Sequence, residues 1–329
     1  MSTDVRRIAA VVVTRDRPVL LRQALDALRG QTRPPQHIIV VDNASAAPTV
    51  ELLRMLMARQ GKGKAMSETT SGTVREPTLE VLRSDLNLGG AGGFALGLER
   101  ACAAGFDWVW LLDDDAIARP PALYELERVL PELGADVGAV CGAVVEFGVL
   151  ALQHRRSFGA WCGTERALPA VVYTSGAPPV RLDTASFVGF LVAADAVVRA
   201  GLPQADFFLA YDDTDYSLKL QRAGMSLWLA PASIIDHRRQ PQGRLRASVF
   251  GPRHYFNVRN RIVVTRTHAR MPMLPALAAS GAGMALLVIS GGWRRASGWR
   301  WLWRALRDGY QGRLGPGPVV DQAGRVRVA

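Results

Sequence analysis

The sequence predicts an α/β fold, in which a mostly parallel sheet carries helices on both faces. Short β-branched strands alternate with amphipathic helices over the first third of the chain, the order that builds a parallel sheet. Polar clusters follow these strands, at the edge where such sheets bind ligands. The apolar run 108–112 stops at three consecutive carboxylates, Asp113 to Asp115. A buried strand therefore delivers three acids to that edge.

The elements before the three acids form repeated strand-helix units. The first helix is entered through Pro18, a residue suited to the first turn. In order, we predict strand 8–13, helix 19–28, strand 37–41, helix 50–57, strand 79–82 and a glycine-rich helix from 87 to 104. Residues 58–77 are rich in Gly, Lys, Ser and Thr, and we expect them to form a mobile surface insertion.

Beyond Asp115 the alternation is looser. We predict helix 122–133, strand 137–145, strand 184–192, helix 211–223, and a strand 226–230 leading to 234–237. Gly189, inside a predicted strand, marks a place where a ligand could approach the backbone. The predicted division of the chain is 1–115 and 116–240 as two halves of one α/β domain, followed by a basic helical region, 241–329.

The three adjacent carboxylates raise one another's pKa unless a cation or hydrogen-bond donors hold them. Mn²⁺ or Mg²⁺ suits carboxylate oxygens, and Asp113 and Asp115 bracket one residue, so both can reach the same ion. The alternative is an acidic strand-to-loop turn with an aspartate capping the helix near Pro120. Taken alone, the cluster fits both interpretations.

Each of three further motifs, taken by itself, fits both a functional and a structural interpretation. The loop Gly89-Gly-Ala-Gly-Gly could cradle phosphate with its amides, or it could serve a tight turn and close helix packing. It lacks the Lys-Ser/Thr of a P-loop. Asp213 and Asp215 open a helix, where the helix dipole also favours acids. His237 fits a structural histidine or a metal ligand.

The positive charge is concentrated in the C-terminal quarter. The whole chain has a formal net charge of +11, while residues 238–329 hold seventeen arginines, no lysine and two acids and carry +15. The preceding residues therefore sum to −4. This asymmetry predicts an anionic partner for the tail, either a lipid surface or nucleic acid. Three cysteines without metal-ligand spacing, and a start unlike a signal peptide, predict a cytoplasmic protein.

An uncharged stretch, 271–293, lies within this tail and precedes further arginines and the tryptophans 299, 301 and 303. Its prolines and glycines favour a pair of interfacial helices over a membrane-spanning helix. Arg beside Trp is typical of a surface that meets anionic headgroups; an oligomer interface or a solvated helix face is the alternative. A nucleic-acid-binding protein would need a binding module or a stacking platform, so we expect no nucleic-acid partner.

The ordered set of motifs resembles the inverting family-2 glycosyltransferases, whose GT-A fold is a Rossmann-like, mostly parallel sheet flanked by helices. The set comprises Asp42-Asn43, Asn87-Leu-Gly-Gly, the triple aspartate, Asp212-Asp-Thr-Asp215 and His237. Segments 87–97 and 107–115 are most similar to actinobacterial galactofuranosyltransferases and related rhamnosyltransferases. The similarity covers residues 8–240 and Arg259-Asn260-Arg261, whereas 146–181 has no counterpart.

The resemblance implies transfer of a hexose from a nucleotide sugar with a divalent cofactor. It assigns Asp113, Asp115 and His237 to Mn²⁺ or Mg²⁺, which stabilises the departing diphosphate. It makes Asp213 the base that takes the proton of the acceptor hydroxyl. The remaining catalytic candidates are Asp212 and Asp215, of which Asp215 is expected to orient acceptor hydroxyls.

The implied substrates are a donor at the strand ends and a glycan acceptor beside it. The donor-binding residues are Thr14, Arg15, Asp42, Asn43, Asn87, Gly89, Gly90, Asp113 and Asp114. Asp114 is expected to contact the donor sugar. The acceptor-binding residues are Trp110, Gly189 and Phe190, with burial as the alternative for the two aromatic rings.

The resemblance also implies the donor, the acceptor and the location. UDP-galactofuranose is the expected donor and dTDP-rhamnose the alternative. A lipid-linked cell-wall or polysaccharide intermediate is the expected acceptor. We therefore expect a peripheral protein that binds anionic lipid at the cytoplasmic face of the cell membrane. The sequence does not predict whether the protein is a monomer or an oligomer.

Overall fold

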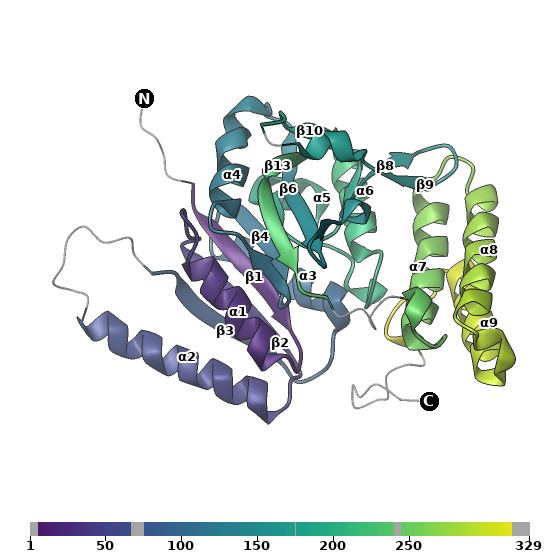
Figure 1. Cartoon of the computed structure of the whole chain (residues 1–329), viewed down its shortest axis with the longest axis horizontal. Helices are drawn as coiled ribbons and strands as arrows, with labels where there is room; N and C mark the ends of the chain where they lie inside the picture. The colour runs from purple at the N-terminus through teal and green to yellow at the C-terminus, as the bar shows by residue number, and fades with distance from the viewer. Residues whose placement is uncertain (1–5, 67–75, 175, 240–244, 318–329) are drawn as a thin grey trace.

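A computed structural model describes residues 6–66, 76–174, 176–239 and 245–317 (Figure 1). Its strands are β1 Ile8–Thr14, β2 His37–Asn43, β3 Thr78–Ser84, β4 Trp108–Asp113, β5 Ala116–Ala118, β6 Val137–Glu146, β7 Val149–Leu150, β8 Arg155–Gly159, β9 Thr164–Ala167, β10 Val180–Leu182, β11 Thr184–Ala185, β12 Phe190–Ala193 and β13 Ser226–His237. Its α-helices are α1 Pro18–Arg29, α2 Ala47–Met66, α3 Gly89–Ala103, α4 Ala122–Val129, α5 Ala194–Ala200, α6 Asp212–Arg222, α7 Pro252–His268, α8 Met273–Ile289 and α9 Ala296–Tyr310.

The central sheet has the strand order β10-β13-β6-β12-β4-β1-β2-β3. Strands β1 to β4 run parallel. Strand β12 runs antiparallel to both β4 and β6, and β13 is parallel to β6, so β6 and β13 point the same way as the first four. Their carboxyl ends lie at one edge of the sheet. This arrangement confirms the predicted α/β class with a mostly parallel sheet.

Helices cover both faces of the sheet. Helix α1 connects β1 to β2 and α2 connects β2 to β3, so these connections move along the sheet in one direction. Helix α3 connects β3 to β4 and moves in the opposite direction. Right-handed crossovers therefore place α3 on the opposite face. There it packs closely on β1, because a Cβ at Gly93 or Gly97 would come within 2.6 Å of Val13 or 2.3 Å of Val11, respectively. Gly93 thus serves helix packing, the alternative interpretation of the glycine-rich loop, and Gly97 does the same one turn further along the helix.

Two predicted elements differ from the structure. Helix α2 continues past residue 57 to Met66, so the expected surface insertion begins as a helix; residues 67–75 lie outside the described residues. The predicted strand 184–192 is two strands. Strand β11 pairs with β8 in a small sheet with β9, whereas β12 joins the central sheet. Alternating apolar residues alone cannot distinguish these partners, and Gly189, at φ +73°, lies between the two strands.

In the described part of the basic tail, the α-helices α7, α8 and α9 lie side by side at one end of the molecule (Figure 1). We expected a pair of interfacial helices in this tail. The structure has α8 and α9 there, and α7 precedes them and contacts both of these helices and also α6. The three helices share an apolar core that includes Phe208 from the chain before α6. Among the described helices, none has the length and apolarity needed to cross a membrane.

Candidate active site

Strand register brings His237 against the triple aspartate. Strand β5 directly follows the acids and pairs antiparallel with the end of β13, with Ala116 opposite His237. The Arg238 amide also donates to the Asp115 carbonyl at 2.8 Å. As a result, His237 Nε2 lies 3.2 Å from Asp115 Oδ1. The contact between residues far apart in sequence is thus fixed by the backbone of two paired strands.

The side chains of Asp113, Asp115 and His237 fit a divalent cation. One ligand atom from each lies within 4.8 Å of the others, and two carboxylates with an imidazole suit Mn²⁺. Burial, followed by the charge of Asp115, raises the pKa of Asp113 to about 7. Burial lowers the pKa of His237, but its hydrogen bonds with Asp115 and Glu146 outweigh burial and raise it to about 10. Negative charge is therefore concentrated where a cation is favourable.

Asp114 makes its hydrogen bonds within the protein. Its Oδ2 accepts from the Thr14 hydroxyl at 2.8 Å, and its Oδ1 accepts from Arg17 Nη1 at 3.0 Å. The same Arg17 nitrogen donates to Asp115 Oδ2 at 2.9 Å. Asp114 therefore ties the loop after β1 to the end of β4. Because the carboxylate is engaged within the protein, its expected contact with the donor sugar would have to form beside these hydrogen bonds, and that contact stays a prediction.

Asn43 and Asn87 order the loop that opens α3. Asn43 Nδ2 donates to the Gly89 carbonyl at 2.9 Å, and Asn87 Oδ1 accepts from the Gly89 amide at 3.0 Å. Gly89 has φ +71°, and a Cβ there would lie 2.0 Å from the Phe208 carbonyl oxygen, so the turn requires glycine. At Gly90, nothing lies within 4 Å of the corresponding position. The loop is therefore fixed at Gly89 and open at Gly90.

Asp42 is also bound within the protein. Its carboxylate accepts from the Ser45 amide at 3.0 Å and pairs with Arg83. Arg15 lies on the neighbouring loop, where its amide is 3.4 Å from Asp114 Oδ2. The predicted donor residues thus lie at the ends of β1, β2 and β4 and at the start of α3. Asp42 orders this edge through its own hydrogen bonds.

Asp212 and Asp213 open α6 in different surroundings. Burial, followed by the neighbouring Asp213, raises the pKa of Asp212 well above its usual value, and the charge of Asp113 adds to this. Burial also raises the pKa of Asp213, but Arg156 opposes it and the Thr214 amide donates to Asp213 Oδ1 at 2.6 Å. The charge of Asp113 acts on Asp212, so the two acidic clusters lie near each other.

Asp215, the third acid of this helix, is tied to the C-terminal helices. Its Oδ1 lies 2.8 Å from His268 Nε2 at the end of α7. The side chain is therefore engaged in a contact between helices, and a role in orienting acceptor hydroxyls would compete with that contact.

The turn before α6 is strained and is held by α7. Three residues of segment 207–211 are not glycine and have φ between +64° and +68°, a conformation that costs about 1–2 kcal/mol per residue. Asn260 Nδ2 donates to three carbonyls of this segment at 2.8 to 3.0 Å. Arg259, fully buried, donates to the Phe207 carbonyl at 2.9 Å. The C-terminal helices thus shape the segment that carries the second acidic cluster.

The three predicted acceptor residues lie in the core. Trp110 and Phe190 are both 0% exposed. A Cβ at Gly189 would lie 2.7 Å from Ile235 Cγ1, so packing against β13 requires this glycine. The expectation that these three residues contact an acceptor is therefore wrong, because the apolar face of each strand is buried by neighbouring elements.

Sequence reasoning missed Arg17, Glu146 and Arg156. Arg17 lies in the loop directly after β1, and Glu146 is the last residue of β6. Position at the carboxyl end of a parallel strand was therefore a signal that could have singled out both. Arg156 belongs to the small sheet, in the region without a recognisable pattern, and only the folded chain brings it near Asp213.

The site thus places an acidic group that fits a metal at the carboxyl ends of parallel strands. This arrangement is typical of the GT-A fold, and the protein is a nucleotide-sugar glycosyltransferase with this fold. The chain belongs to glycosyl transferase family 2, which it matches over residues 9–172. It is 31% identical over 266 residues to galactofuranosyltransferase GlfT1 of Mycobacterium tuberculosis, covering 77% of this chain and 80% of the relative. GlfT1 of Mycolicibacterium smegmatis is 33% identical over 227 residues, 68% of each chain.

Two solved structures share the fold. The structure of GalNAc-T7 with UDP, GalNAc and Mn²⁺ has a TM-score of 0.64 at 13% identity, over 93% of this chain; the chain spans 57% of the length of GalNAc-T7. The mannosyltransferase PcManGT of Pyrobaculum calidifontis with GDP-Man and Mn²⁺ has a TM-score of 0.54 at 15% identity, over 94% of this chain and 88% of PcManGT. Identities this low relate the folds alone.

Proposed function

We propose that the protein is a metal-dependent, inverting galactofuranosyltransferase that uses UDP-galactofuranose and a lipid-linked cell-wall or polysaccharide acceptor. The observation that carries this proposal is the convergence of Asp113, Asp115 and His237 at the carboxyl edge, next to the acids that open α6. The choice of sugar is supported by the similarity to the two mycobacterial galactofuranosyltransferases.

Asp113, Asp115 and His237 would hold Mn²⁺ or Mg²⁺. When bound, this ion supplies a Lewis acid that neutralises the donor diphosphate and stabilises it as a leaving group. Arg17 adds a fixed positive charge beside it, with its guanidinium 2.9 Å from Asp115. The open side of the loop at Gly90 provides space for the donor next to the start of α3.

Asp213 would take the proton from the acceptor hydroxyl. Direct displacement needs a base on the face opposite the departing diphosphate, and that base must be ionised. Arg156 and the Thr214 amide both favour the ionised form of Asp213. Asp212 suits the role less well, because burial and the neighbouring Asp213 raise its pKa well above the usual value and favour its protonated form.

The tail would dock on an anionic membrane surface and bring the enzyme to its lipid-linked acceptor. Leu277, Met284 and Val288 are exposed along one stripe of α8, and Trp299 and Trp303 are exposed on α9. Residues 238–329 carry a net charge of +15. Exposed apolar side chains among arginines suit the boundary between acyl chains and anionic headgroups. The protein would therefore be peripheral, at the cytoplasmic face.

The donor is tested by incubating the purified chain with UDP-galactofuranose or dTDP-rhamnose, with Mn²⁺ or with EDTA, and measuring the released nucleoside diphosphate. We expect UDP release that requires Mn²⁺ and little dTDP release. Preferential release of dTDP would make the protein a rhamnosyltransferase, and no release with any divalent ion would exclude both activities. A rise in Tm with one nucleotide sugar gives a second readout, because a ligand of the native state stabilises it.

A further inference from the structure

We propose that Glu146 is a positioning residue for the metal centre, which fixes the orientation and the tautomer of His237, and that His154 holds Glu146 in place. This role rests on the proposed function, because it takes His237 as a ligand of the divalent ion. Glu146 and His154 belong to none of the motifs that identify the family in the sequence. Their role follows from where the fold places them.

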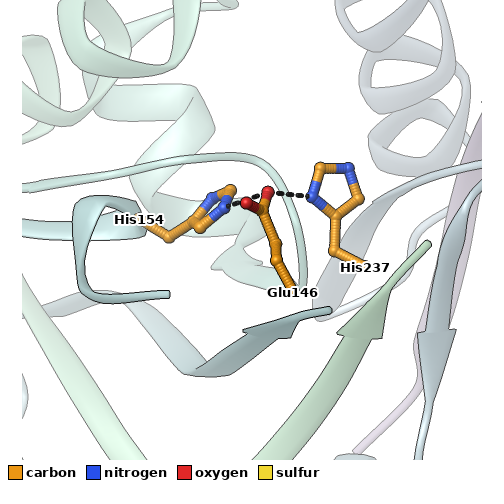
Figure 2. Close-up of side chains that lie close together, drawn as sticks. All are labelled: Glu146, His154 and His237. Atoms are coloured by element: carbon orange, nitrogen blue, oxygen red, sulfur yellow. Dashed lines mark hydrogen bonds and ion pairs between the residues drawn. The ribbon is translucent and has the colours of Figure 1, made fainter. Parts of the chain in front are cut away.

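Glu146 lies between the two histidine rings (Figure 2). Its Oε1 is 2.8 Å from His237 Nδ1 and 3.1 Å from His154 Nε2. Its Oε2 accepts from Gln153 Nε2 at 3.1 Å, and His154 Nδ1 lies 2.7 Å from Ser186 Oγ. Both carboxylate oxygens and both nitrogens of His154 are therefore engaged in one connected set of hydrogen bonds.

The contact at Nδ1 determines what the other ring nitrogen of His237 can do. A carboxylate oxygen only accepts, so Nδ1 carries a hydrogen and donates it to Glu146. The other nitrogen, Nε2, faces Asp115, with 3.2 Å to Oδ1. Without an ion, Nε2 also carries a hydrogen, which faces Asp115. When an ion is bound by Asp113 and Asp115, Nε2 is the nitrogen that gives up its hydrogen and offers its lone pair, because the hydrogen on Nδ1 stays with Glu146. Glu146 thus selects the tautomer that the metal centre needs.

The fold keeps this contact rigid. Glu146 is 3% exposed and His154 is 8% exposed. A buried carboxylate with three donors cannot turn away without leaving them unsatisfied, which costs about 1–3 kcal/mol for each group. Glu146 and His237 are the last residues of β6 and β13, which are paired in parallel. The backbone hydrogen bonds between these strands therefore set the separation of the two side chains.

The same three side chains, Glu146, His154 and His237, offer ligand atoms within 4.8 Å of one another, which raises the alternative of a second ion. Their direct contacts of 2.8 and 3.1 Å have the lengths of hydrogen bonds. A second ion on Nδ1 of His237, with the first on Nε2, would also require the ring to lose both hydrogens. We therefore assign the group to positioning and make the second ion an outcome of the test.

The test measures Mn²⁺ affinity of the full chain by calorimetry for Glu146→Met and Glu146→Gln. We expect binding 10–100-fold weaker for Glu146→Met, the usual effect of losing such a partner, and a smaller loss for Glu146→Gln, which keeps an acceptor oxygen. Glu80→Gln is the matched control. Glu80 also lies beside a histidine, with Oε2 3.0 Å from His37 Nε2, but on β3, away from the acidic clusters, so its Mn²⁺ affinity should equal that of the wild type.

The tautomer of His237 gives a second readout that is independent of activity. The chain has five histidines, so ¹⁵N labelling of histidine gives a simple spectrum, and the loss of one signal in His237→Ala assigns it. In the Mg²⁺-saturated wild type we expect the hydrogen on Nδ1, and in Glu146→Met a mixture of tautomers. A purely structural role would lower Tm and leave the tautomer unchanged.

The outcomes separate this role from the proposed function. If the wild type binds Mn²⁺ and Asp115→Ala does not, but both Glu146 variants keep wild-type affinity and the Nδ1 hydrogen, the positioning role is overturned and the metal centre stands. If the wild type binds no divalent ion, the proposed function itself fails and the role of Glu146 falls with it. Two ions per chain, with one lost in His154→Ala, would replace positioning by a second metal site.

Discussion

The cluster 113–115 and the cluster 212–215 each contain three aspartates, yet the fold surrounds them differently. The first ends a buried strand and meets Arg17 and His237, which lie at the carboxyl edge of the same sheet. The second begins a helix and meets Arg156 from the small sheet and His268 from α7. The partners of the first therefore follow from the order of the strands, whereas those of the second depend on how separate layers pack.

This difference separates two kinds of carboxylate. The first cluster gathers charge around an ion-sized group of ligand atoms. In the second, burial raises the pKa of both Asp212 and Asp213, and Arg156 opposes the rise at Asp213. Changes in the first cluster should therefore affect metal binding and turnover together, and changes in the second should affect turnover alone.

The largest expected effect comes from Asp115→Ala. Loss of this ligand should abolish Mn²⁺ binding and reduce turnover by roughly 10³-fold, since a metal contributes several kcal/mol to such a step. Calorimetry and release of nucleoside diphosphate measure the two effects. Asp236→Ala is the control, because this residue precedes His237 but pairs with Arg119 at the surface. Retained Mn²⁺ binding in Asp115→Ala would contradict the assignment of the centre.

Asp213→Asn should reduce kcat by about 10²–10⁴-fold, the usual contribution of a general base, with Mn²⁺ affinity unchanged. Single-turnover kinetics and calorimetry test this split. Asp212→Asn should have a smaller effect, because burial and the neighbouring Asp213 raise the pKa of this carboxyl well above its usual value and favour the protonated form, which asparagine resembles. A larger loss in Asp212→Asn than in Asp213→Asn would reverse the assignment of the base.

Asn260→Ala should lower the free energy of unfolding by about 3 kcal/mol, because it removes the donor of three hydrogen bonds to the turn before α6. It should also reduce kcat, since the turn positions the second cluster, while Mn²⁺ affinity stays unchanged. Urea unfolding measures the stability. Asn257→Ala, on the same helix, is the control and should change stability by less than about 0.5 kcal/mol. Equal stability of the two variants would show that α7 does not hold the turn.

The smallest effect is expected in the tail. Trp303→Ala should weaken binding to vesicles with anionic lipid by about tenfold, since burial of a large apolar side chain contributes about 1.5–3 kcal/mol. Vesicle flotation over a salt series measures this, with DNA as the competing anion. Tyr124→Ala, an exposed aromatic of α4, is the control. Tight, salt-dependent DNA binding without vesicle binding would assign the tail to nucleic acid instead.

The sequence by itself determined the fold class and the acids of the site. Strands that alternate with helices, and polar residues after each strand, identify a parallel sheet and its ligand-binding edge, because both follow from local periodicity. The family was also visible in the order of the motifs, and the similarity to family 2 confirms it. The predicted metal group lies together in the folded chain, while its role and the domain boundaries stay predictions.

Only the tertiary structure decided which partners these residues have. It engaged Asp114 with Thr14 and Arg17, buried Trp110 in the core, and placed Glu146 behind His237. These outcomes depend on strand order, register and the packing of α7, which join residues far apart in the chain. Sequence periodicity reports which face of an element is apolar, but it carries no information about what lies against that face.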